Sequence, residues 1–155
     1  MPPIIKYTLS FIFYIALQVF VLNHIGFLQF INPYLYIYFI ISLPVTFPKI
    51  PALLLAFLMG GIIDIFGNTP GINIFAGVLV AFLRPYLLQI FQSNRKFYYI
   101  LILVTIHHVT LFLLEAATIF SCFVYLNIIC SIAFTMLLIA GVNLINRKVS
   151  ESSKF

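Results

Sequence analysis

Apolar residues dominate this chain in long runs, and only short polar stretches separate one run from the next. The runs lie at 4–21, 34–47, 51–66, 73–91, 97–118 and 122–145. The longer ones reach the roughly 18 residues that mark a candidate membrane-spanning helix. The pattern therefore predicts an all-α membrane protein, a bundle of about six transmembrane helices, with residues 1–155 forming a single integral membrane domain.

Two parts of this pattern need closer reading. The last two runs form one apolar stretch whose length as a single helix, about 75 Å, would far exceed a hydrocarbon core of about 30 Å, so we expect a turn near Ser121.

The second and third runs are short and would cover about 22 to 24 Å each as helices, which permits a re-entrant hairpin. Burying Lys49 at its tip would cost about 2.5 to 3.5 kcal/mol, so we expect the tip to reach the membrane surface. For the second span we expect Asn32 as the cap and Pro33 as the first helical residue.

Composition and charge exclude a water-soluble domain. Apolar residues make up 64% of the chain and charged residues 7%, against about 25% charged residues in soluble domains. Cytoplasmic loops of membrane proteins carry an excess of Lys and Arg. With the N-terminus inside, every Lys and Arg except Arg84 falls on the cytoplasmic side: Lys6, Lys49, Arg95, Lys96, Arg147, Lys148 and Lys154. We therefore expect cytoplasmic N- and C-termini, and the net charge of +5 requires no nucleic-acid partner.

Asp64 is one of only three acidic residues, and it stands in the apolar stretch GGIIDIFGNTPG. A structural interpretation makes it an acceptor for the amides of Asn68 and Thr69 in the following turn, with Gly67 and Gly71 supplying tight backbone conformations. Pro70 belongs to the same turn. Because ionisable residues within spans are rare, contact with a partner's polar group or a proton or ion site are the functional alternatives.

Arg84 stands in the next predicted span, in AFLRPYL. Its axial offset from Asp64 is about 15 Å by helix rise, so we expect no direct salt bridge between them. The side chain could snorkel to the cytoplasmic headgroups with its stem along apolar surface. Alternatively, Pro85 frees the carbonyl of Ala81, and a local kink could open a cleft toward a lipid phosphate or another subunit.

Small residues recur at helix-packing spacing in the third and fourth spans. They are Ala56 and Gly60 in the third, and Gly77 and Ala81 in the fourth. Small side chains four residues apart let helix backbones approach closely in lipid. We expect these faces to serve internal packing more than the binding of another protein.

An enzymatic site is not indicated. His107, His108 and Glu115 share one predicted span, but neighbouring histidines point about 100° apart and no H-x-x-x-H or H-E-x-x-H spacing occurs. We therefore predict structural histidines, no catalytic residue, no metal site and no cofactor. The predicted outer loop at 23–32 is uncharged and apolar, which is typical of a surface that faces lipid or another protein.

The segments NPYLYIYFIISLP and LLAFLMGGIIDIFGNTPGINIFAGVLVAFLRPYL resemble the rod shape-determining protein MreD family of bacteria. The resemblance covers nearly the whole length, and its motifs lie at about 32–87. They are a second span that ends in Pro, then G-x-x-x-D at Gly60 and Asp64, then Pro70 and Gly71 before the fourth span.

This resemblance implies a non-catalytic scaffold of the cell-wall elongation machinery in the bacterial inner membrane. The implied partners are the single-span protein MreC, the MreB cytoskeleton, a RodA-type glycosyltransferase and a class B penicillin-binding transpeptidase, besides membrane lipid. The family is similar in fold to the substrate-binding components of energy-coupling vitamin transporters. The alternative function is therefore that of such a component, although the first span has only Ala16 where those proteins carry an A-x-x-x-A docking face.

Overall fold

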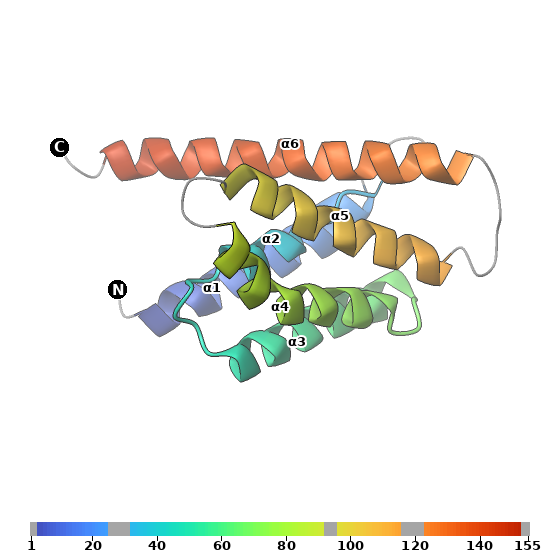
Figure 1. Cartoon of the computed structure of the whole chain (residues 1–155), viewed down its shortest axis with the longest axis horizontal. Coiled ribbons are helices and arrows are strands. Elements are labelled where there is room, and N and C mark those ends of the chain that lie inside the picture. Colours follow the sequence, from blue (N-terminus) through green and yellow to red (C-terminus); the bar gives the residue numbers. More distant parts are fainter. Residues whose placement is uncertain (1–2, 25–31, 92–95, 116–122, 153–155) are drawn as a thin grey trace.

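The chain folds into a bundle of helices (Figure 1). The computed structural model describes residues 3–24, 32–91, 96–115 and 123–152. Its helices are α1 (Pro3–Ala16), extended by a π-helical turn (Leu17–Val21) and a 3₁₀ turn (Leu22–His24), then α2 (Tyr36–Ser42), α3 (Lys49–Gly67), α4 (Ile72–Ile90), α5 (Lys96–Glu115) and α6 (Phe123–Ser152). The expected all-α class is confirmed for these residues.

Four helices are long and apolar enough to cross a membrane. They are α3, α4, α5 and, within α6, the stretch Leu126–Asn146, and a shorter apolar helix covers Ile5–Val21. The chain is therefore a multi-pass membrane protein. In Figure 1, α1 begins and α6 ends at the same end of the bundle, and the α3–α4 turn lies at the opposite end. The turn expected near Ser121 and most of the predicted outer loop at 23–32 lie outside the described residues.

The second predicted span differs most from its expected form. A helix over 34–47 is wrong in extent, because α2 covers only Tyr36–Ser42, which is about 10 Å long. The expected cap is also wrong: the helix begins after Leu35, and no side chain of its own segment caps it. Non-helical backbone therefore flanks α2 on both sides.

Helices α3 and α4 pack closely against one another, and glycine makes this possible. A Cβ atom on Gly60 would lie 2.6 Å from Cα of Ile74 and 2.7 Å from the carbonyl oxygen of Asn73. Gly77 is less crowded, since its Cβ would meet the carbonyl oxygen of Ala56 at 3.4 Å. The packing role predicted for these small residues is therefore supported by geometry, and Gly60 is the position of the two that admits no side chain.

We expect Gly60→Ala to lower stability by about 1 to 3 kcal/mol, because the methyl group would push two backbones apart. Gly61→Ala is the matched control, since a Cβ there meets only the flexible end of Ile74 at 3.7 Å. The measurement is the fraction of monodisperse protein that survives heating in detergent. Equal survival of the two variants would contradict the close packing at Gly60.

The last helix lies along one side of the bundle (Figure 1). Only 17% of the most apolar 18-residue stretch of α6 is buried, against 33% of the corresponding stretch in each of α3, α4 and α5. Its exposed residues follow helical spacing and include the small residues Ala133 and Ala140 beside Leu137 and Leu144. This face is available to lipid or to another transmembrane helix.

Candidate functional site

The short helix α2 is the buried centre of the structure. Tyr36, Ile37 and Ile40 have no exposed surface, and the residues around them are nearly as well covered. A helix of this length leaves orphan amides at its start and orphan carbonyls at its end. Within a membrane these groups cannot reach water, so irregular backbone is tolerated there only where protein groups satisfy it.

Gln18, from the π-helical turn that follows α1, satisfies the start of α2. Its Oε1 accepts hydrogen bonds from the amides of Leu35 (2.9 Å) and Tyr36 (3.4 Å), and its Nε2 donates to the carbonyl of Pro33 (3.0 Å). Only 1% of Gln18 is exposed. A primary amide is suited to this position because it offers an acceptor and a donor together. The sequence pattern alone did not single out Gln18.

Arg84, from α4, satisfies the other end of α2. Its guanidinium donates to the carbonyls of Leu43 and Pro44, and the residue is 3% exposed. A cation is favoured where helical carbonyls end. The expectation that Arg84 snorkels to the headgroups is therefore wrong, because the residue is buried and its partners are backbone carbonyls about 40 residues earlier in the chain. Pro85 lies within the continuous helix α4, and the carbonyl it frees on Ala81 is not among the described partners of Arg84.

Helix α6, supported by α5, also bonds the segment that contains α2. Thr135 of α6 accepts a hydrogen bond from the amide of Tyr34 (3.2 Å), and Ser131 accepts one from the amide of Asn32 (3.3 Å). His108 of α5 bonds the carbonyl of Val104 through Nδ1 (2.9 Å), so Nδ1 carries the proton and Nε2 accepts from the hydroxyl of Thr135 (3.2 Å). Tyr38 of α2 donates in turn to the side chain of Asn143.

His107 completes this set through the ring of Tyr36. Its Nε2 lies 2.7 Å from the hydroxyl of Tyr36, and that hydroxyl lies 3.4 Å from the carbonyl oxygen of Asn73. A Tyr36 hydroxyl that donates to Asn73 can accept from an Nε2–H of His107, and only the Nδ1 lone pair then remains without a partner. Both histidines are thus hydrogen-bonded within the bundle, which supports the structural role predicted for them.

Asp64 is held by the turn that follows α3 and by the start of α4. Its Oδ1 accepts from the hydroxyl of Thr69 and from the backbone and side-chain amides of Asn73 (3.0 and 2.9 Å), and its Oδ2 accepts from the amide of Ile74 (2.9 Å). Three of these four bonds reach Oδ1 and one reaches Oδ2, so both carboxylate oxygens are held. The structural interpretation is supported, but the predicted donors are wrong: the amides of Asn68 and Thr69 bond the backbone carbonyl of Asp64, and the carboxylate is held by the Thr69 hydroxyl and by α4.

The turn itself also differs in detail from the prediction. The left-handed residues are Asn68 (φ 52°) and Gly71 (φ 80°). Gly67 is the last residue of α3, and no left-handed conformation occurs there, so the special role predicted for it is wrong. Asn68 serves as the left-handed C-cap of α3, a position that tolerates Asn as well as Gly. Pro70 is an exposed residue of the turn.

We expect Asp64→Asn to lower stability by about 1 kcal/mol and Asp64→Ala by about 1 to 3 kcal/mol. Asn retains one carbonyl acceptor but loses the bond to Ile74, whereas Ala leaves every donor without its partner. The measurement is the yield of folded protein that survives heating in detergent. We expect this yield to be highest for the parent, lower for Asp64→Asn and lowest for Asp64→Ala. If Asp64→Ala were as stable as the parent protein, the structural role of Asp64 would be contradicted.

The candidate site residues fall into two separate groups in the fold, and Asp64 and Arg84 have different partners. Gly60, Asp64, Gly67, Pro70 and Gly71 meet at the α3–α4 turn. Arg84 lies about 20 Å along α4 from that turn and binds carbonyls at the far end of α2, and Pro85 follows it in α4. Within the described part of the chain, no three His, Cys, Asp or Glu residues come together in a way that could hold a metal ion.

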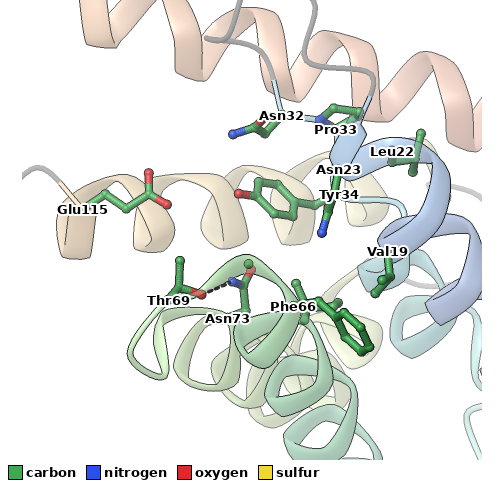
Figure 2. Close-up of a pocket in the computed structure, with 12 residues that line it drawn as sticks. Val19, Leu22, Asn23, Asn32, Pro33, Tyr34, Phe66, Thr69, Asn73 and Glu115 are labelled. Carbon is green, nitrogen blue, oxygen red and sulfur yellow. Dashed lines mark hydrogen bonds between the residues drawn. The ribbon is translucent and has the colours of Figure 1, made fainter.

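A cavity of about 510 Å³ opens beside the turn (Figure 2). It is bounded by the end of the α1 extension, the α3–α4 turn and the end of α5. Its lining mixes apolar and polar residues: Val19, Leu22, Asn23, Asn32, Pro33, Tyr34, Ile63, Phe66, Gly67, Thr69, Asn73 and Glu115.

A second cavity of about 980 Å³ lies between α1, α2 and α6, near the other end of the bundle, with Lys6 and Asn146 in its lining.

Comparison with known proteins adds no relative: no family model matches the chain, and no curated protein or solved structure matches it.

Proposed function

We propose that this protein is a non-catalytic scaffold of the bacterial cell-wall elongation machinery, as its resemblance to the MreD family implies. The observation that supports this role is the use of its polar side chains. The backbone around α2 is held by Gln18, Arg84 and Thr135, and Thr135 is in turn bonded to His108. The start of α4 is held by Asp64. These five polar side chains of the described residues are thus engaged in maintaining the fold.

In this proposal the chain crosses the inner membrane about six times, with the segment around α2 as an interrupted second crossing. Both termini face the cytoplasm, as the distribution of Lys and Arg favours. We expect reporter fusions at Asn68 and at Phe155 to report opposite sides of the membrane. Fusions that report the same compartment would contradict this topology.

The exposed face of α6 is the surface that we assign to partner proteins. It is the least buried of the four spanning helices described above, and its small residues Ala133 and Ala140 would let a partner helix approach closely. The implied partners are an MreC-like single-span protein, the MreB cytoskeleton, and the RodA-type glycosyltransferase with its class B penicillin-binding transpeptidase.

Copurification after gentle detergent extraction tests the proposal. We expect recovery of the MreC-like protein and the wall-synthesis enzymes, and reduced recovery with Ala140→Leu. The same substitution at Ala16, a half-buried residue at the end of α1, serves as the comparison, because it adds the same volume away from the α6 face. Recovery of an ATPase module in place of wall-synthesis proteins would overturn scaffolding in favour of transport.

A further inference from the structure

The cavity beside the α3–α4 turn carries an acceptor that the described part of the fold leaves unused. Asn73 is 4% exposed and lines this cavity, and its Oδ1 has no hydrogen-bond partner. Its orientation is fixed by chemistry, because the opposite atom of the amide lies 2.9 Å from a carboxylate oxygen of Asp64 and must be the donor Nδ2. A buried carbonyl oxygen without a partner is costly and calls for a donor.

The facing wall of the same cavity carries negative charge. Figure 2 shows the Glu115 carboxylate, from the end of α5, and the Tyr34 hydroxyl pointing toward one another above Thr69 and Asn73. Glu115 and Tyr34 interact electrostatically, and Asn32 lines the same side of the cavity. No Lys or Arg occurs among the described residues that line the cavity. The polar part of the cavity therefore presents one anionic group and the unused acceptor of Asn73, besides the amide and hydroxyl groups of Asn23, Asn32 and Tyr34, which can donate or accept.

Most of the remaining lining is apolar, apart from Asn23. Val19, Leu22, Ile63 and Phe66 line it together with Pro33. A volume of about 510 Å³ lies within the range of roughly 300 to 1,000 Å³ that is usual for small-molecule sites. In such sites a few placed polar groups among apolar ones fix the orientation of the ligand.

We propose that this cavity binds an organic cation rich in N–H donors, of the amidinium or guanidinium type, on a small apolar or aromatic body. Its N–H groups would meet the Glu115 carboxylate and Tyr34 on one wall and Oδ1 of Asn73 on the other. Charge-assisted hydrogen bonds of this kind are about twice as strong as neutral ones. The site is separate from the α6 face assigned to partner proteins, and it does not depend on the scaffold role.

The test uses the whole protein in detergent with 4-fluorobenzamidine and its neutral counterpart 4-fluorobenzamide, followed by fluorine NMR. We expect the cation to bind at least about tenfold more tightly than the amide, because only the cation gains charge-assisted bonds. Glu115→Gln should remove most of this difference, and Tyr34→Phe should weaken cation binding severalfold. Glu151→Gln, which removes the same charge from the far end of α6, should leave binding unchanged.

A second arm replaces the probe with acetylarginine methylamide, to distinguish a free small cation from an arginine side chain of a protein. Binding of 4-fluorobenzamidine alone assigns the site to small molecules, and binding of both assigns it to the shared cationic group. Equal affinity for cation and amide would overturn the proposal. So would unchanged binding in Glu115→Gln and Tyr34→Phe, provided that both variants match the parent in heat-resistant yield.

Discussion

Replacing Arg84 with Met is expected to lower stability by about 2 to 5 kcal/mol and to reduce the amount of folded protein severalfold. The reason is local: the carbonyls of Leu43, a buried residue, and of Pro44, an exposed one, lose the donor that holds them. A hydrogen bond to a charged group contributes about 1.5 to 3 kcal/mol, and a buried acceptor such as that of Leu43 costs about 1 to 3 kcal/mol when it is left without a partner. Removing the buried guanidinium also relieves its own desolvation, which is why we do not expect the full cost of a broken ion pair.

Lys49→Met is the matched control for Arg84→Met. Lys49 is an exposed cation at the start of α3, and its ammonium lies 5.3 Å from the centre of the Tyr86 ring. An exposed cation–π contact is worth about 0.5 to 1 kcal/mol, so this variant should remain close to the parent. Heat-resistant yield in detergent and the amount of membrane-inserted protein measure both changes. Similar losses in the two variants would show that Arg84 acts only through its charge.

Gln18→Leu is expected to have an effect as large, about 3 to 5 kcal/mol, because three buried backbone groups lose their partner together. The effects of such neighbouring groups do not add fully, so the total is smaller than three independent penalties. Leu fills a similar volume, so packing loss contributes little. The expected result is a bundle that inserts but unfolds at a much lower temperature.

Gln89→Leu provides the control, since Gln89 is an exposed residue of α4 and undergoes the same chemical change. Thermal unfolding followed by circular dichroism in detergent compares the two. We expect Gln89→Leu to match the parent. A Gln18→Leu variant that unfolds with the parent would contradict the role of Gln18 in holding the start of α2.

The long helices could be predicted from the sequence because their apolar runs and polar boundaries are local features. The predicted runs at 51–66, 73–91 and 97–118 lie close to α3, α4 and α5. The interruption around α2 could not be predicted in the same way. The run at 34–47 is equally apolar whether it is helical or extended, and its flanking backbone is stabilised by groups far away in sequence, such as Gln18 and Thr135.

The candidate site shows the same division between local and distant causes. The role of Asp64 could be predicted because its partners lie within ten residues, in the turn and at the start of α4. The role of Arg84 could not, since its acceptors belong to a segment that only the tertiary fold brings beside α4. A glutamine within the first apolar run was the available signal for Gln18, because an amide in lipid requires partners.

Hydrogen exchange at the amides of Leu35 and Tyr36 tests most directly whether polar side chains hold an interrupted, buried second segment. In the parent protein these amides should exchange as slowly as those in the middle of α4, because both are buried and bonded to Gln18. In Gln18→Leu their protection should fall by at least about tenfold while α4 remains protected, since opening would then be local. Fast exchange at both amides in the parent would contradict the assignment.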